Sequence, residues 1–205
     1  MAIDSYVVFV PYNNPPLDSE STVDMTNNTE ELAKDLKKFP AGTLVGGKAK
    51  PGKIFEVEDY SFDIEQTLNI GSQSSGAGAG KVTFNPFSIT RKIDIASPLL
   101  FDMACSGTAF KQVILALRKS VGAGASGADS MVSGFIFLRF DFKLVAIKTI
   151  SWSHDDESPK ETVTFEYGGL QIRYCQQNPD GTLNPVKIGG WSRVQNKQDH
   201  ILDSI

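Results

Sequence analysis

The stretch Lys81–Ser120, which reads KVTFNPFSITRKIDIASPLLFDMACSGTAFKQVILALRKS, constrains the fold more than any other part of the chain. It predicts two strands separated by one short helix. Ser97 is placed to cap this helix, Pro98 suits its first turn because a missing N–H costs nothing there, and Gly107 can end it in a left-handed conformation. Both flanking segments alternate apolar and polar residues, as strands do. The chain is therefore expected to be mainly β.

The same alternation predicts strands along most of the remaining sequence. With one helix among seven strands, the pattern favours a small antiparallel β-barrel or a two-sheet sandwich. Closing the sheet into a barrel also removes the unpaired strand edges through which sheets aggregate. The predicted strands are Ser5–Val10, Phe55–Glu65, Lys81–Ile93, Phe110–Ser120, Phe135–Ser153, Glu161–Gln177 and Trp191–Val194.

Three local features refine this prediction. In the longest strand, Arg139, Asp141 and Lys143 alternate with large apolar residues, which indicates a sheet with one face in water. Pro86 shifts the alternation of its segment, which predicts a bend in an edge strand because proline cannot donate to a ladder. The alternation also changes parity near Glu58–Asp59, where we expect a bulge.

Composition and charge narrow the class of protein. The chain has 205 residues, 40% of them hydrophobic, which suffices for one sizeable core. Its formal net charge of −4 does not indicate binding to nucleic acid or anionic lipid. The apolar run Tyr6–Val10 is shorter than the roughly 7–15 residues of a signal peptide, and no window reaches the ~20 apolar residues of a membrane span. We therefore expect folding in the cytoplasm and export, if any, without a cleaved signal peptide.

Residues Asn13–Lys53 interrupt the strand pattern. A short helix is predicted at Glu30–Phe39, where Asn28 and Glu31 have the spacing of a capping box. This segment is too small to be a second domain. We therefore expect a single domain over residues 1–205, in which 13–53 is a surface insertion between the first two strands.

Two glycine motifs match nucleotide-binding sequence patterns in part, but neither meets the requirements of such a site. The run Gly76–Lys81, GAGAGK, lacks the glycine at position 75 and the hydroxyl at position 82 of a phosphate-binding loop, and it precedes a strand instead of a helix. Gly122, Gly124 and Gly127 match a dinucleotide-binding pattern, but they join two strands. We expect neither a nucleotide nor another cofactor.

An enzyme is disfavoured by the scarcity of histidines, since His154 and His200 are the only two. The acidic residues after His154 could suggest a metal site, but consecutive side chains of an extended segment point to different sides. A triad of Cys105, His154 and Asp155 can be formulated, yet Cys105 is better explained as a packing residue of the helix. Cys105 and Cys175 match no metal-binding spacing and are expected to stay reduced. No catalytic or metal-binding residue is assigned.

The glycine-rich segment Gly71–Gly80 has a more specific functional interpretation than the nucleotide, metal and triad motifs. It cannot bury apolar area, and glycine loses more conformational entropy on ordering than any other residue. It is either a surface loop without a role or a loop ordered against a neighbouring subunit, which small side chains allow to approach closely. The candidate subunit interface consists of Gly71, Ser72, Gln73, Ser74, Ser75, Gly76, Ala77, Gly78, Ala79 and Gly80.

Several short motifs follow one another along the chain: SFDI at Ser61–Ile64, the glycine-rich segment, FSITRKID at Phe87–Asp94, ASPLLF at Ala96–Phe101, FKQVIL at Phe110–Leu115, ETVTFEY at Glu161–Tyr167 and GWSRVQNK at Gly190–Lys197. In this order they resemble the hemolysin co-regulated protein (Hcp) family, the tube proteins of the bacterial type VI secretion system. The resemblance covers Ser5–Val10 and about Phe55–Lys197, and its strongest part is Thr83–Leu117.

The resemblance implies a small β-barrel with one helix on its side, assembled into hexameric rings that stack into a tube. It further implies a contractile sheath and a spike protein as partners, small effectors carried and chaperoned in the lumen, and delivery to the extracellular space or into target cells. A subunit of this kind does no chemistry, binds no nucleic acid and enters no membrane. The insertion 13–53 departs from the family and is expected on the outer wall or rim of the ring.

Two other classes of function stay open on the sequence. One is a stand-alone β-sandwich module that captures a small ligand or a protein. The other is a hydrolase that uses Cys105 or the loop after His154. The mass of the protein in solution separates the ring subunit from the module, because only the ring subunit forms a stable hexamer.

Overall fold

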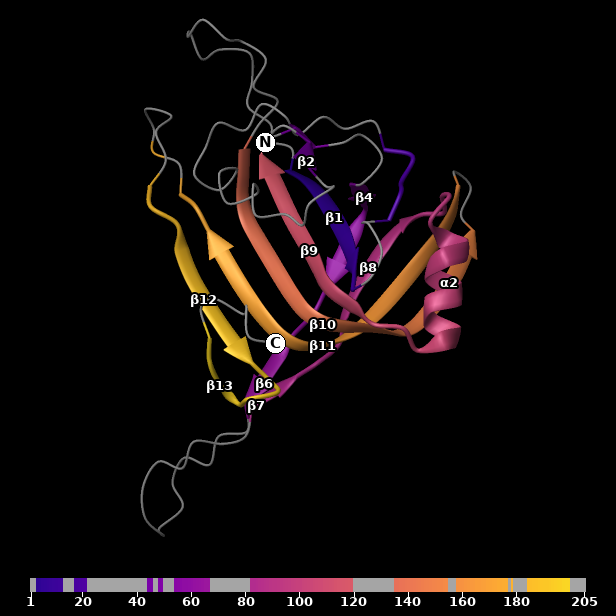
Figure 1. Ribbon diagram of the computed structural model, residues 1–205. Coiled ribbons are helices and arrows are strands. Elements are labelled where there is room, and N and C mark those ends of the chain that lie inside the picture. Colours follow the sequence, from indigo (N-terminus) through magenta and orange to yellow (C-terminus); the bar gives the residue numbers. More distant parts are fainter. Residues whose placement is uncertain are drawn as a thin grey trace, which may run out of the picture.

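The computed structural model describes residues 3–12, 17–21, 44–45, 48–49, 54–66, 82–119, 135–154, 158–176, 178 and 184–199 (Figure 1). This part of the chain is mainly antiparallel β with one helix, which confirms the predicted fold class. The helix is α2 (Ser97–Ser106), and the strands are β1 (Ile3–Pro11), β2 (Leu44–Val45), β3 (Lys48–Ala49), β4 (Phe55–Val57), β5 (Asp59–Ser61), β6 (Ile64–Gln66), β7 (Val82–Phe84), β8 (Phe87–Lys92), β9 (Phe110–Lys119), β10 (Phe135–His154), β11 (Pro159–Tyr174), β12 (Lys187–Ser192) and β13 (Lys197–Gln198).

Nine of these strands form one antiparallel sheet that curls round on itself. Its order is β13-β12-β11-β10-β9-β1-β4, while β8 pairs with β11 and, on its other side, with β5. Strands β4 and β5 meet at Glu58, whose N–H donates to the carbonyl of Thr90 in β8 at 2.9 Å. The chain thus crosses at Glu58 from one part of the sheet to the other, which closes the barrel. The irregularity predicted near Glu58–Asp59 is this crossing and not a bulge.

The long hairpin of β10 and β11 spans both halves of the barrel. The first half of β11 pairs with β8 and its second half with β12. The pairing of β10 with β11 is interrupted at Leu144, which has a φ of 49° and lies across from Gly168. A Cβ at Gly168 would lie 3.1 Å from side-chain atoms of Leu144 and of Val194, so a larger residue would displace its neighbours. This glycine therefore permits the close approach at the bend.

Aromatic side chains fill the interior of the barrel. The ring centroid of Phe87 lies 3.9 Å from that of Phe142 and 4.7 Å from that of Phe165, and all three rings are buried. Helix α2 adds Leu100 and Met103 to the same cluster. The helix is therefore packed on the side of the barrel, as the family resemblance implies. Figure 1 shows it beside the part of the barrel where β10 ends and β11 begins.

The ends of α2 confirm two of the three predicted signals. Pro98 lies in the first turn, and Gly107 adopts a φ of 66° directly after the helix. The residue that caps the N-terminal end is Ala96, however, and no side chain caps it. Ser97 is the first helical residue, and its hydroxyl donates to the carboxylate of Glu161. Its prediction as the cap is therefore wrong.

Two predictions about strand surroundings are also wrong. Strand β8 is not an edge strand, because β5 and β11 flank it, and Pro86 lies in the short break between β7 and β8. The face of β10 that carries Arg139 and Asp141 is not wet, because the two residues are only 4% and 2% exposed. Lys143 on the same face is half-buried.

Several predicted features lie outside the described residues: the helix at 30–39, the glycine-rich segment 71–80, the loop that contains Gly122, and His200. The described flanks of the insertion 13–53 lie side by side, because the hydroxyl of Ser19 donates to the Ile54 carbonyl at 2.7 Å. Leu17 is buried in the main core, and Ile54 packs in a second cluster on the other face of β1. In the part of the chain that the structure describes, no helix has the length and apolar character needed to cross a membrane.

Candidate interaction surfaces

A buried ionic cluster holds the start of α2 on the sheet. The guanidinium of Arg91 lies 2.6 Å from Glu161 Oε1 and 2.9 Å from Asp94 Oδ1. The Ser97 hydroxyl donates to Glu161 Oε1 at 3.0 Å and accepts a bond from Arg91 at 3.2 Å, while the indole N–H of Trp152 donates to Glu161 Oε2 at 3.2 Å. Arg91 is 2% and Glu161 0% exposed. The position of α2 therefore depends on a charge pair shielded from water.

Two large apolar side chains on the flanks of α2 are exposed. Ser97, Leu100 and Met103 face the barrel, whereas Leu99 and Phe101 are 45% and 47% exposed. The rings of Phe101 and Trp152, both exposed, lie 6.0 Å apart, and we call this aromatic pair the helix patch.

An apolar groove lies where the β6–β7 hairpin faces strands β11 and β12. Its volume is about 760 Å³. A second hollow of about 530 Å³ shares Phe84 and Trp191 with it and is also lined by Arg193. The guanidinium of Arg193 stacks 5.0 Å from the ring of Tyr167 and donates to that residue's carbonyl at 2.6 Å. We call this surface the hairpin groove, and its apolar walls are Ile64, Val82, Phe84, Leu170, Ile172 and Trp191.

The buried polar face of β9 and β10 contains a second network. Asp141 accepts bonds from Arg139 at 2.6 Å and from the Gln112 amide at 2.8 Å, and the ammonium of Lys143 donates to Gln112 at 3.2 Å. Arg173 of β11 lies 3.6 Å from the other oxygen of Asp141. The charged residues that were predicted to face water are thus paired across β9, β10 and β11. Their contacts help to fix the register of these strands.

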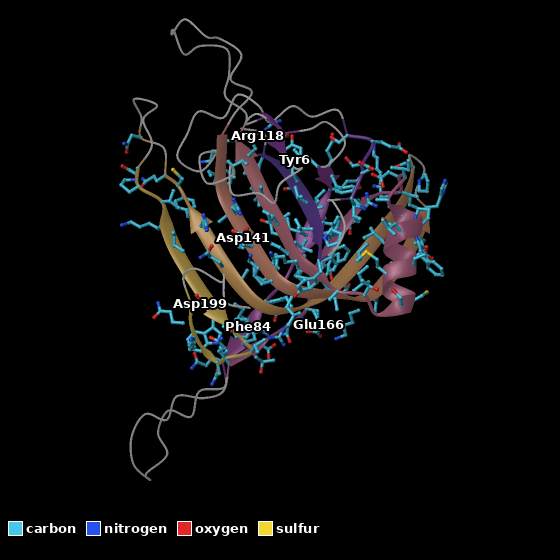
Figure 2. All side chains as sticks on the ribbon, viewed as in Figure 1. Tyr6, Phe84, Arg118, Asp141, Glu166 and Asp199 are labelled. Carbon is cyan, nitrogen blue, oxygen red and sulfur yellow. The ribbon has the colours of Figure 1, made fainter. Side chains whose placement is uncertain are left out.

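Two buried tyrosines have strongly raised pKa values. Burial raises the pKa of Tyr6 to about 12, although Arg118, which donates to the Tyr6 hydroxyl at 2.7 Å, acts in the opposite direction. Burial likewise raises the pKa of Tyr167 to about 12, against the effect of Arg193. Figure 2 shows Tyr6 and Arg118 at one end of the sheet and Phe84, in the hairpin groove, at the other. Both phenols are neutral at physiological pH and supply no base there.

The residues considered for chemistry do not form a site within the described chain. His154 is exposed at the end of β10, and Asp155 lies outside the described residues. Cys105 is exposed on α2, so its interpretation as a packing residue is wrong, while Cys175 is buried. The two cysteines form no disulfide, as predicted. Among the described residues no group of three or more His, Cys, Asp or Glu side chains could hold a metal ion.

Sequence reasoning missed the helix patch and the hairpin groove. The patch has no signal in the sequence of the helix alone, because Phe101 meets Trp152 of β10, which lies far along the chain. The groove has none, since its walls come from four strands that are far apart in the chain. The predicted interface segment 71–80 lies outside the described residues, but Gln66 and Val82 on either side of it both line the groove.

The chain is similar to proteins of one secretion system. A family model described as "Type VI secretion system effector, Hcp" matches residues 47–174. The curated protein hcp1 of Pseudomonas aeruginosa is 31% identical over 120 residues, which are 58% of this chain and 69% of that protein.

Solved structures extend the similarity to almost the entire fold. A structure described as a type six secretion system protein superposes with a TM-score of 0.69 and 22% identity, over 97% of this chain and 100% of that one. Hcp1 from Salmonella typhimurium gives a TM-score of 0.60, again with 22% identity and the same coverage of the two chains. At this level of identity the two structures establish the fold.

Proposed function

This chain belongs to the Hcp family of type VI secretion proteins, and we propose that it is a structural subunit of the secretion tube whose copies form hexameric rings that stack. The family is one of structural secretion proteins and not of enzymes. The main support for the proposal is the family match over residues 47–174, which spans strands β3 to β11 and helix α2.

The surfaces of the described chain support this proposal. A closed ring needs two different patches on each subunit, one for each neighbour. The helix patch and the hairpin groove are two such apolar surfaces on one chain. We propose the segment 71–80 as a further part of the subunit contact, because Gln66 and Val82, which precede and follow it in the sequence, both line the groove. The insertion 13–53 is proposed to lie on the outer wall or rim of a single domain.

Further partners follow from membership of the family and are part of the proposal. A contractile sheath would drive the stacked rings behind a spike protein, and small effectors would travel in the lumen. The tube would leave the bacterial cytoplasm for the extracellular space or a target cell without cleavage of a signal peptide. Hcp proteins are secreted by the type VI system, which is the basis for this location.

A stand-alone binding module is the second candidate function, and the hairpin groove favours it. Its volume of about 760 Å³ falls within the range of roughly 300–1,000 Å³ typical of small-molecule sites, and apolar walls with few polar groups are also typical of such sites. A module of this kind would work as a monomer and would not be needed for secretion of other proteins.

Removing this chain from the bacterium that encodes it is expected to abolish type VI secretion of the spike protein into the medium, because the sheath then has no tube to drive. Mass spectrometry of culture supernatants measures the loss, and expression of the chain from a plasmid should restore secretion. A cytoplasmic enzyme is the control for lysis. Undiminished secretion of the spike in the absence of the chain would refute the proposed function if no second tube protein is present.

A further inference from the structure

The β6–β7 hairpin has few described contacts with the rest of the barrel. Within the described residues, β6 and β7 pair with each other and with no other strand. The ring of Phe84 lies 6.4 Å from that of Tyr167 and 5.7 Å from the guanidinium of Arg193. The hairpin also lines the hairpin groove, where Ile64 is 44% exposed. Because an isolated two-stranded hairpin is marginally stable in water, an apolar partner in the groove would hold it on the barrel.

The wall of the groove that β12 forms has room for such a partner. Gly189 and Gly190 line it without side chains, and a Cβ built on Gly189 meets no atom within 4 Å. The next residue, Trp191, is half-buried, and its indole N–H is buried without a hydrogen-bond partner in the part of the chain that the structure describes. Buried donors normally have an acceptor. A backbone segment that enters the groove can supply both apolar contacts and a carbonyl.

The described chain leads directly to this wall. Strand β13 follows β12 and pairs with it, so that Trp191 lies across from Gln198. The N–H of Asp199, the last described residue, donates to the carbonyl of Gly190 at 3.1 Å. Figure 2 shows Asp199 and Phe84 in the same lower part of the barrel. The residues after Asp199 therefore start at the rim of the groove.

The sequence after Asp199 suits the walls of the groove. It reads HILDSI over residues 200–205, and Ile201, Leu202 and Ile205 are aliphatic. Six residues reach about 20 Å when extended, which is enough to cross the groove from Gly190. Placing aliphatic side chains against apolar walls removes both surfaces from water.

We propose that residues 200–205 fold back into the hairpin groove of the same copy, where Ile201 and Leu202 pack on its apolar walls. This contact fastens the β6–β7 hairpin to β11 and β12. The inference goes beyond the proposed function, because it concerns one copy and holds whether or not copies form rings. The surface that this side offers to a neighbour then includes residues 200–205. A small ligand or a second copy in the groove is an outcome that the test can reveal.

Trp191 can report whether the groove is filled. The chain has two tryptophans, so Trp152→Phe leaves Trp191 as the only one. In this background, Ile201→Asn combined with Leu202→Asn makes the segment polar without adding charge. The matched control, Ile201→Val combined with Leu202→Met, keeps it apolar. Circular dichroism tests folding, and native mass spectrometry establishes that the compared proteins have the same oligomeric state.

The asparagine variant should expose the indole that the unchanged segment covers. Its emission maximum should shift to longer wavelength and its acrylamide quenching constant should rise, whereas the control should match the parent in both. Equal quenching of parent, control and asparagine variant would overturn the inference, because Trp191 would then owe its environment to something other than residues 200–205.

Cross-linking identifies the occupant in the otherwise unchanged chain and decides the question if Trp152→Phe does not fold. With the photoreactive benzoylphenylalanine in place of Leu202, irradiation should join this position to β7 or β12. The product should keep the mass of one chain, 22.3 kDa, under denaturing conditions.

Three results of these measurements would overturn the proposal. Cross-links to strands that do not line the groove would place the segment elsewhere. A product with the mass of two chains, joined at the groove, would assign the groove to a second copy. A small molecule bound to the wild-type chain in native mass spectrometry, and lost on Gly189→Phe, would make the groove a ligand site.

Discussion

Replacing Arg91 with alanine is expected to lower the free energy of unfolding by about 3–5 kcal/mol, the usual cost of removing one partner of a buried ion pair. The substitution leaves the Glu161 carboxylate, which is fully buried, without the guanidinium 2.6 Å away. It also removes the bond that Ser97 at the start of α2 accepts. Urea unfolding followed by circular dichroism, at a fixed protein concentration, measures the loss.

An exposed ion pair provides the matched control. Lys148 and Glu166 lie 3.1 Å apart, but both side chains are more than 40% exposed, so Lys148→Ala should cost no more than about 1 kcal/mol. The double change Arg91→Met with Glu161→Leu should cost less than Arg91→Ala alone, because it leaves no buried charge behind. Equal small losses for Arg91→Ala and Lys148→Ala would show that the buried cluster does not hold the helix.

Phe87→Ala is expected to lower the free energy of unfolding by a similar amount, about 3–5 kcal/mol, for a different reason. The ring is 1% exposed and stacks between Phe142 at 3.9 Å and Phe165 at 4.7 Å, so its removal leaves a cavity between side chains of three strands. The interior cannot collapse easily there because the barrel is closed. Thermal or urea unfolding measures the change.

A volume change at the same site provides the control for Phe87→Ala. Phe87→Leu keeps most of the apolar volume and should cost clearly less. A loss below about 1 kcal/mol for Phe87→Ala would mean that the aromatic stack is not the centre of the core and that the barrel closes on other contacts.

The parts of the fold that were predictable depend on local chemistry. Pro98 and Gly107 mark the helix because their backbone preferences act without tertiary partners, and the alternation along β9, β10 and β11 follows from burial of one strand face. The resemblance to a known family supplied the closure into a barrel, which no single segment encodes.

The predictions that failed depended on what lies across from a residue in the folded chain. Ser97 looked like a cap, but Glu161, which lies 64 residues away, takes its hydroxyl. Arg139 and Asp141 looked like solvent-facing charges, but partners on β9 and β11 allow them to be buried. The hairpin groove was not predictable for the same reason, because its walls meet only after the barrel has closed.

Native mass spectrometry of the purified wild-type chain tests the central claim most directly, since the proposed tube is built from rings of this one protein. The predicted result is a species of six times 22.3 kDa that persists on moderate dilution. A wild-type chain that remains at 22.3 kDa over the whole concentration range accessible to the measurement would contradict the account and favour the stand-alone binding module.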